Sequence, residues 1–254
     1  MMAQISLLRP LVIGLFVSAL NGCETPTAGE TTIPEGFVKL SSLTEDIIQD
    51  IRYAGGDNFV GRPVDGYLTG ECILATAAAE ALVRVQMKLE SNGLGLVVFD
   101  CYRPQRAVDD FVSWSLNDDQ STKNAFYPNL QKDALFSDGY IARQSGHSRG
   151  ATVDLAVVRL TRSDPGGNGQ NVPCTEVMGS NASKDYLDFG TAFDCFDTLS
   201  NTSDPRVSGQ VAENRTMLVD VMASEGFANY PLEWWHFTFR PEPFPDKYFD
   251  FPIE

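Results

Sequence analysis

The chain has 254 residues, of which 43% are hydrophobic, so it can bury a sizeable core. Its 34 acidic residues outnumber 19 basic ones and give a formal net charge of -15. A surface of that sign repels nucleic acid and anionic membranes, so neither is expected as a partner. The length fits one large domain or two small ones, and we expect one.

The N-terminus has the pattern of a processing signal. Arg9 precedes an apolar run over residues 11–20 that is too short to span a bilayer as a mature helix. The residues ending at Cys23, Leu-Asn-Gly-Cys, resemble a bacterial lipoprotein box, so residues 1–22 are expected to be a signal peptide and Cys23 a lipid anchor. An ordinary secretory signal with a chance cysteine is the alternative. Either one takes the mature protein out of the cytoplasm, to the cell envelope or the medium.

Four cysteines remain when Cys23 is set aside, and an oxidising compartment allows them to pair in any of three ways. We expect Cys174 to pair with Cys195 and close an irregular loop. We expect Cys72 to pair with Cys101, tying the start of a helix to the end of the next strand. Four buried free thiols are the alternative. The absence of a Cys-x-x-Cys pair argues against a cysteine zinc site.

The folded domain is expected over residues 37–254, after a flexible tether over residues 23–36 that is rich in Thr, Pro, Gly and Glu. Residues 50–53 predict a short strand. Apolar positions at helical spacing predict an amphipathic helix over residues 74–89. The run Leu-Gly-Leu-Val-Val-Phe-Asp at 94–100 predicts a strand in the middle of a sheet.

Pro104 suits the first turn of another helix, whose inward stripe would include Phe111 and Trp114. Arg103 therefore lies at a strand-to-helix junction, where side chains commonly face a cleft. Residues 116–144 are polar and irregular, and we interpret them as a long functional loop.

In the C-terminal half, residues 151–158 predict a strand that carries Asp154. Residues 159–209 contain many turn-forming residues and predict mostly surface loop. A helix over residues 210–225 and a strand over 234–239 follow. Because helices and strands are mixed without regular alternation, the predicted fold is α+β, with a central, mostly antiparallel sheet flanked by helices.

The chain has only two histidines, and both fall in short segments that also carry a carboxylate. A catalytic zinc takes three ligands from His, Asp or Glu and leaves a fourth position for water. His147, Asp154 and His236 supply such a set. A turn followed by a strand can present the first two, and the third must come from a distant segment. Taken singly, each histidine is better explained as a hydrogen-bonded structural residue than as a metal ligand.

Glu233 is the candidate general base, because it lies three residues before His236. Side chains three apart in a regular strand point to opposite faces, so Glu233 must lie in the turn that enters the strand. Trp234 and Trp235 either wall the site or pack in the core. The Arg103 guanidinium either bridges a carboxylate or stabilises a developing oxyanion.

The pattern Ser-x-His-x-x-Gly-x-x-x-Asp at residues 145–154, followed by Glu-x-x-His at 233–236, resembles the zinc signature of the D-alanyl-D-alanine metallopeptidases. Asp-Ile-Arg-Tyr at 50–53, Tyr-Arg-Pro at 102–104 and Glu-Trp-Trp-His-Phe at 233–237 are similar to the VanX-type D-alanyl-D-alanine dipeptidases. The resemblance runs from about Val38 to Tyr248. The chain departs from the family in its leader, its extra cysteines and an insertion-like loop at about 162–191.

The resemblance implies hydrolysis of D-Ala-D-Ala or a related D-containing dipeptide, in a cleft on the sheet that holds one Zn²⁺. It implies that His147, Asp154 and His236 bind the zinc, and that Glu233 is the base. It further implies that Arg103 stabilises the tetrahedral intermediate, and that Tyr53 and Ser145 line the substrate pocket. Two alternatives stay open: a D,D- or L,D-carboxypeptidase or endopeptidase of the same fold that acts on peptidoglycan, and a catalytically silent, metal-stabilised binding module. The oligomeric state is left open.

Overall fold

The computed structural model describes Met1 and residues 33–160, 172–176 and 185–254. The expected signal peptide, Cys23 and most of the tether lie outside these residues, as does most of the insertion-like loop. In the described part of the chain, no helix is long and apolar enough to cross a bilayer.

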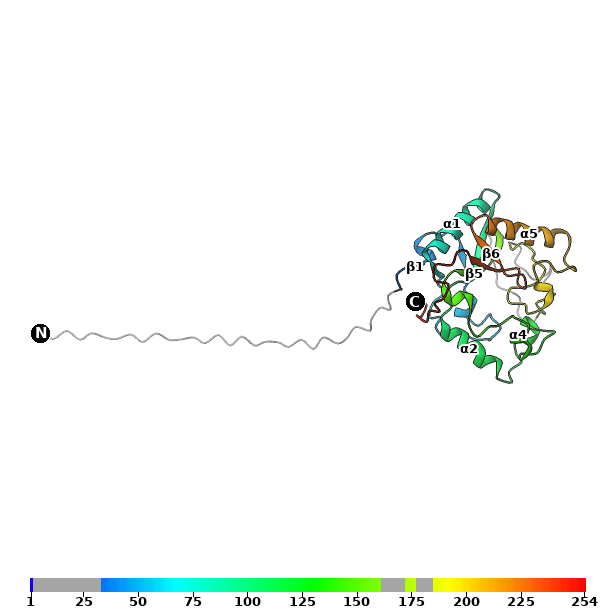
Figure 1. Cartoon of the computed structure of the whole chain (residues 1–254), viewed down its shortest axis with the longest axis horizontal. Coiled ribbons are helices and arrows are strands. Elements are labelled where there is room, and N and C mark those ends of the chain that lie inside the picture. Colours follow the sequence, from blue (N-terminus) through cyan, green and yellow to red (C-terminus); the bar gives the residue numbers. More distant parts are fainter. Residues whose placement is uncertain (2–32, 161–171, 177–184) are drawn as a thin grey trace. The chain divides into compact units, whose positions relative to one another are not determined.

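A five-stranded sheet forms the centre of the fold (Figure 1). Its strand order is β2-β4-β5-β7-β6, and every neighbouring pair is antiparallel except β2 with β4. The strands are β2 (Ile48–Gln49), β4 (Leu94–Asp100), β5 (Thr152–Arg159), β6 (Phe227–Asn229) and β7 (His236–Phe239). A separate antiparallel pair joins β1 (Phe37–Lys39) to β3 (Ile73–Ala75). The α+β prediction and the mostly antiparallel sheet are confirmed.

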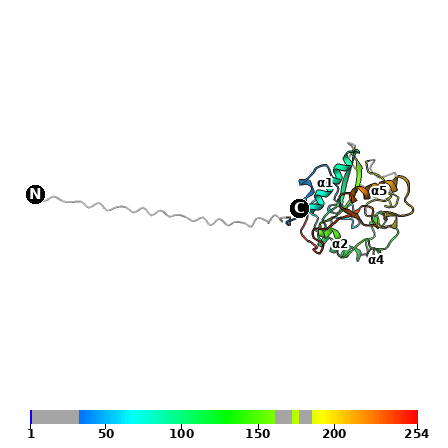
Figure 2. The same ribbon diagram turned by 45° about the horizontal axis from the view of Figure 1, so that its top comes forward.

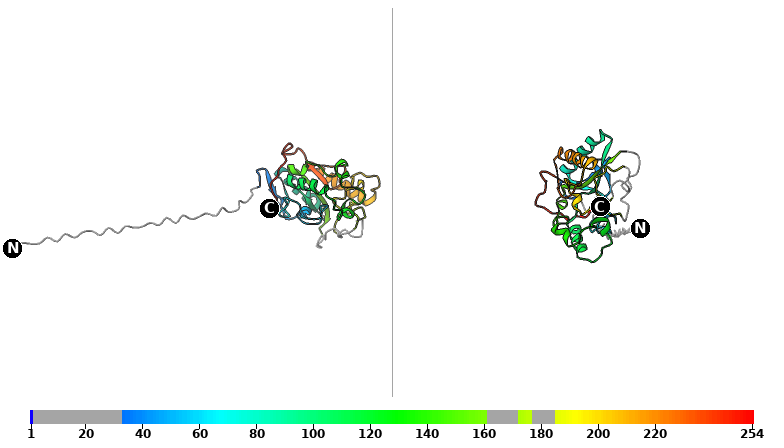
Figure 3. Two further views of the ribbon diagram at one scale, coloured as in Figure 1. Left: turned by 90° about the horizontal axis from the view of Figure 1, so that it is seen from below. Right: turned by 90° about the vertical axis from the view of Figure 1, so that its right-hand side faces the viewer.

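Helices cover the sheet on both sides. The two longest helices, α1 (Thr76–Glu90) and α5 (Gly209–Ala223), lie side by side on one side of the sheet. Helices α2 (Gln105–Ser115) and α4 (Ala134–Ser137) lie on the other side (Figures 1 and 2). The remaining short elements are α3 (Lys123–Phe126), η1 (Leu40–Ser42), η2 (Arg52–Ala54), η3 (Gly146–Arg149) and η4 (Thr198–Ser200). Figure 3 shows the same arrangement from below and from the side.

The helix predicted over 74–89 is confirmed as α1, which begins two residues later because Leu74 pairs with Val38 in the β1–β3 ladder. Its buried residues recur every three or four positions and face the sheet: Ala78, Leu82, Val85 and Leu89. Gly93 ends this segment with a φ of 68°, a left-handed conformation that glycine adopts without steric cost. The strand predicted at 94–100 and the helix after Pro104 are confirmed as β4 and α2.

The strand predicted at 50–53 is wrong, because pairing with β4 stops just before it. The last backbone bond runs from Asp50 N to Val98 O, and Arg52 then begins the 3-10 turn η2. The buried Arg52 guanidinium holds this turn by bonding both Asp50 and Asp57. Local ion pairs thus override the strand propensity of the apolar residues between them.

The prediction that residues 159–209 are mostly surface loop is wrong for residues 185–201. Polar and apolar residues are about equally frequent in residues 185–201, and the aromatic side chains pack inward: Phe189 stacks on Trp234, and Phe193 stacks on Phe99 of β4. A disulfide between Cys174 and Cys195 closes the loop as predicted, and the Cys72–Cys101 pair is confirmed as well. The free-thiol alternative is therefore excluded.

Candidate active site

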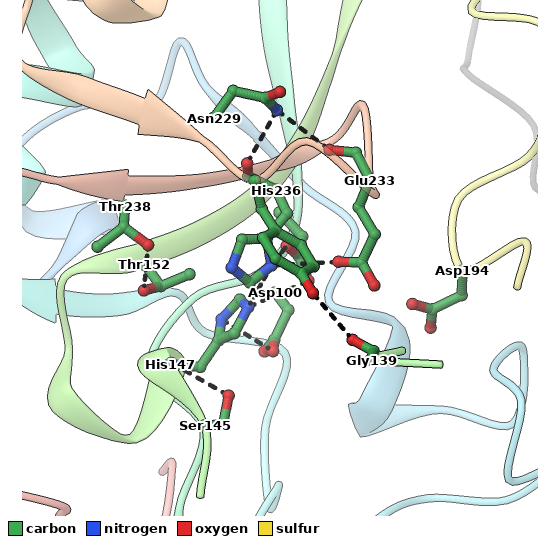
Figure 4. A network of polar contacts seen from close by, with 12 residues as sticks. Asp100, Gly139, Ser145, His147, Thr152, Asp194, Asn229, Glu233, His236 and Thr238 are labelled. Carbon is green, nitrogen blue, oxygen red and sulfur yellow. Dashed lines mark hydrogen bonds and ion pairs between the residues drawn. The ribbon is translucent and has the colours of Figure 1, made fainter. Parts of the chain in front are cut away.

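The site is built on three adjacent strands. Asp154 of β5 is paired in register with Asp100 at the end of β4 and with His236 at the start of β7. Directly paired residues of neighbouring strands point to the same face of a sheet, so three polar side chains form a row across the middle of this one. His147 approaches the row from η3, in the turn before β5, as predicted (Figure 4).

The turn that carries His147 is fixed at both ends. The Ser145 hydroxyl caps η3 by accepting a hydrogen bond from the His147 backbone amide. Gly150 ends η3 with a φ of 77°, and a Cβ atom there would come 2.1 Å from a ring carbon of Phe37. The glycine of the sequence motif is therefore required both by backbone conformation and by packing.

Three candidate metal ligands lie together. His147 Nε2 lies 3.3 Å from Asp154 Oδ2, and His236 Nδ1 lies 3.0 Å from Asp154 Oδ1. Each residue offers one ligand atom, and these three atoms all lie within 4.8 Å of one another. The three residues expected from the sequence to bind the metal are thus brought into one cluster by the fold.

The donor set fits a divalent cation. His147 Nδ1 donates to the Cys101 carbonyl at 2.7 Å, so its Nε2 carries the lone pair that faces the cluster. Asp154 Oδ1 is buried, and His236 Nδ1 lies 3.0 Å from it. Burial lowers the pKa of His236. Burial alone would raise the pKa of Asp154, but the two imidazoles beside it hold that pKa below its usual range. A neutral imidazole and an ionised carboxylate are the forms that bind metal.

Glu233 lies in the turn between β6 and β7, as the side-chain period required. Asn229 holds this turn by donating to the backbone carbonyls of Glu233 and His236, each at 3.1 Å. The Glu233 carboxylate lies 3.4 Å from His236 Nδ1 (Figure 4). Burial, with the negative charges of Asp154 and Asp194, raises the pKa of Glu233 well above its ordinary value. A strand was predicted to begin at Trp234, but β7 begins at His236 because the turn occupies the two tryptophans.

Arg103 bridges a carboxylate, which is the first of its two interpretations, and it also faces the cavity. Its Nε and Nη2 atoms donate to Asp100 Oδ2 at 2.9 and 2.8 Å, while its guanidinium also lines the cavity and lies over the rings of Tyr53 and Phe111. Asp100 is 0% exposed and accepts a further bond from Tyr67. Sequence reasoning missed this carboxylate, although its place at the end of a buried strand and three residues before an arginine was a usable signal.

Asp194 is a second functional candidate that the sequence analysis missed. Its carboxylate lines the cavity, opposite Glu233 and the histidines (Figure 4). The Tyr53 hydroxyl donates to it at 2.7 Å. Burial, followed by the charge of Asp154, raises the pKa of Asp194 to about 8. Among the described residues no cation forms an ion pair with it. The signal was an acidic residue in the apolar stretch Phe-Asp-Cys-Phe at 193–196.

The cavity has a volume of about 180 Å³. Drug-sized ligands usually need 300–1,000 Å³, so this one suits a small molecule. Ser145 and Tyr53 line it, as expected for substrate-pocket residues, and part of the loop predicted at 116–144 covers it through Gly139–Gln144. Trp234 and Trp235 do not line it but are buried in the core.

Comparisons with known proteins identify similar sequences over nearly the same residues. A family model described as "D-ala-D-ala dipeptidase" matches residues 34–254. A D-alanyl-D-alanine dipeptidase of Streptomyces coelicolor is 41% identical over 85% of this chain and 98% of its own length. Proteins with the same name from Enterococcus faecium and Escherichia coli are 36% and 29% identical, over 86% and 79% of this chain and 98% and 83% of their own lengths.

Proposed function

The chain belongs to the D-Ala-D-Ala dipeptidase family of metal-dependent peptidases, and on that premise we propose that it is a zinc enzyme that hydrolyses D-alanyl-D-alanine or a closely related D-containing dipeptide. One observation carries the proposal beyond family membership: a small cavity is lined both by the candidate metal ligands and by the carboxylate of Asp194, which has no cation partner among the described residues. A free dipeptide has an ammonium group close to its scissile carbonyl. Asp194 suits the ammonium group, and a metal held by the three ligands suits the carbonyl.

The residues divide the chemical work as follows. When bound, zinc supplies a Lewis acid that polarises a carbonyl and lowers the pKa of water. Glu233 takes the proton of the attacking water and returns it to the leaving amine, which requires a carboxylate of raised pKa beside the metal ligands. Arg103, held by Asp100, stabilises the negative charge that develops on the carbonyl oxygen. Asp194, held by Tyr53, binds the substrate ammonium.

A carboxypeptidase or endopeptidase acting on longer peptidoglycan stems is disfavoured for a physical reason. An acylated stem peptide has no ammonium to pair with Asp194, so it loses the contact that a free dipeptide would make there. A metal-stabilised binding module without turnover has no use for a buried base, yet Glu233 is present beside His236.

We further propose that the enzyme acts in the cell envelope, where Cys23 carries a lipid anchor and the substrate comes from turnover of cell-wall peptides. The apolar leader over residues 11–20 supports export, and the two disulfides suit an oxidising compartment. Mass spectrometry of the N-terminal peptide from membranes tests this: diacylglycerol on Cys23 is expected, and an unmodified, uncleaved N-terminus would contradict it.

The test of the activity compares D-Ala-D-Ala with N-acetyl-D-Ala-D-Ala, using the zinc-loaded protein. We expect rapid release of D-alanine from the free dipeptide only. Efficient cleavage of the acetylated form would overturn the dipeptidase assignment in favour of a carboxypeptidase. Elemental analysis of protein purified without added metal, followed by chelation and reconstitution, tests the cofactor: we expect one zinc per chain and loss of activity on its removal.

A further inference from the structure

The residues on either side of Asp194 are held by a buried arginine that belongs to neither sequence motif. Arg215 of α5 is 2% exposed. Its Nε and Nη2 donate to the Phe189 carbonyl at 2.8 and 2.5 Å, its Nη2 also donates to Leu199 O at 3.0 Å, and its Nη1 donates to Asn201 O at 2.7 Å. One guanidinium therefore joins the two ends of residues 189–201, which we call the Asp194 segment.

Arg215 forms no ion pair with any described residue, and its hydrogen bonds all go to backbone carbonyls. Burying a cation without a carboxylate partner is costly, and burial accordingly lowers the pKa of Arg215 to about 10. An apolar side chain of similar size would avoid that cost, but it would leave the Phe189 and Leu199 carbonyls without their donors and would remove one of the two donors to Asn201 O. The planar fork of arginine donates in several fixed directions at once, which the single ammonium of lysine does not.

Hydrogen bonds inside the Asp194 segment connect the ends held by Arg215 to the middle of the segment. The Ser200 hydroxyl donates to Cys195 O at 2.7 Å and lies 3.0 Å from the Thr191 hydroxyl. Trp234 Nε1 donates to the same Thr191 oxygen. Cys195 forms a disulfide with Cys174. Its neighbour Asp194 has a φ of 57°, a left-handed backbone conformation that is uncommon for residues other than glycine and that the surrounding contacts hold in place.

We propose that Arg215 is a positioning residue: by joining the ends of the Asp194 segment it sets where the Asp194 carboxylate stands in the cavity, and so selects dipeptides with a free amino group. The disulfide Cys174–Cys195 acts on the same segment from its other side. This inference rests on the proposed function, because it assumes that Asp194 binds the substrate ammonium. Arg215 itself does not line the cavity and acts only through the segment.

The first experiment measures kcat and KM for D-Ala-D-Ala in Arg215→Lys, which keeps the charge and loses the fork. We expect KM to rise about 10-fold with kcat within about twofold of the parent, because an ammonium contact made equally in ground and transition states changes binding alone. In an Asp194→Asn background the same substitution should add about twofold or less, since the two residues act in series. Equal effects in both backgrounds, or a fall in kcat alone, would overturn the proposal.

A control separates positioning from general destabilisation. Lys132 is also buried, and also donates to backbone carbonyls, those of Trp114 and Asn117. We expect Lys132→Met to lower the melting temperature yet leave KM within about twofold of the parent. If Arg215→Lys does not fold, the pair Cys174→Ser and Cys195→Ser supplies the second variant, with the same expected rise in KM and the same dependence on Asp194.

Hydrogen exchange tests the physical claim without relying on activity. In Arg215→Lys, the amides of residues 189–201 should exchange at least 10-fold faster than in the parent, while those of β4 and β5 stay unchanged. Unchanged exchange in the Asp194 segment would overturn the inference whatever the substrate is. Cleavage of N-acetyl-D-Ala-D-Ala by the parent would instead defeat the proposed function, so the two failures are distinguishable.

Discussion

The carbonyl oxygen of Cys101 accepts a 2.7 Å hydrogen bond from His147 Nδ1, and Cys101 is itself bonded to Cys72. A structural disulfide is therefore connected to a candidate metal ligand through a single backbone carbonyl group. Groups that orient a metal-binding imidazole fix its tautomer and its direction, and losing them typically weakens metal binding. This disulfide thus has a role at the site as well as in stability.

Replacing both cysteines of that pair, Cys72→Ala with Cys101→Ala, should lower the free energy of unfolding by about 3 kcal/mol and weaken zinc binding about 10-fold. Denaturant unfolding of the metal-free protein and zinc titration against a competing chelator measure the two effects. The matched control is Cys174→Ala with Cys195→Ala, which should lose similar stability and keep its zinc affinity. Equal zinc affinity in both variants would refute the link to His147.

Glu233→Gln should lower kcat by roughly 10² to 10⁴ fold while zinc content stays at one per chain, because the amide keeps the shape of the side chain but cannot accept the proton. Steady-state kinetics and elemental analysis measure this. Glu225→Gln is the control: Glu225 pairs with Arg84 and Lys88 and does not line the cavity, so its loss should leave kcat unchanged. Turnover near the parental rate would rule out Glu233 as the base.

Arg103→Lys should lower kcat about 10²-fold with a small change in KM, since lysine cannot bond Asp100 through two nitrogens and still present a donor to the cavity. The neighbouring Arg106 pairs with Asp250 outside the cavity, so Arg106→Lys should retain nearly full activity. A fall confined to KM would show that Arg103 binds the ground state instead.

The stability of the metal-free protein should fall as pH rises from about 4 to about 8. Burial, then the charge of Asp154, raises the pKa of Asp194 to about 8, against 3.8 for an ordinary aspartate. Between these values the folded state holds a proton that the unfolded state has released, so stability is fully present below the lower value and lost on approaching the upper. Glu233, whose pKa burial also raises, acts in the same direction. His236, whose pKa burial lowers from 6.5, acts in the opposite direction below that value, and the two carboxyl groups together set the net direction.

Thermal unfolding of chelated protein across this pH range measures the effect. Asp194→Asn should flatten the dependence, because an amide does not titrate, and added zinc should reverse its direction by favouring the deprotonated ligands. A metal-free protein whose stability rises from pH 4 to 8 would contradict the assigned direction. Asp188→Asn is the control, since Asp188 lies on the same loop but outside the cavity.

The elements and residues that depend on local pattern could be predicted from the amino-acid sequence. Helical spacing predicted α1, α2 and α5, the apolar run predicted β4, and motif spacing placed His147 in a turn before the strand of Asp154. The side-chain period of two placed Glu233 in a turn, because that residue and His236 could not otherwise face one site. Cysteine number and compartment led to the two disulfides that the fold contains.

The carboxylates that support the site became identifiable from the folded structure. Asp100 is paired across the sheet with Asp154, and Asp194 reaches the cavity from a segment whose turn-forming residues predicted surface loop. Nothing in the local pattern around either residue shows its partner, because strand register and the burial of residues 185–201 depend on packing between segments far apart in the chain. The same reason hid Arg215, whose three carbonyl partners exist only once that segment folds over α5.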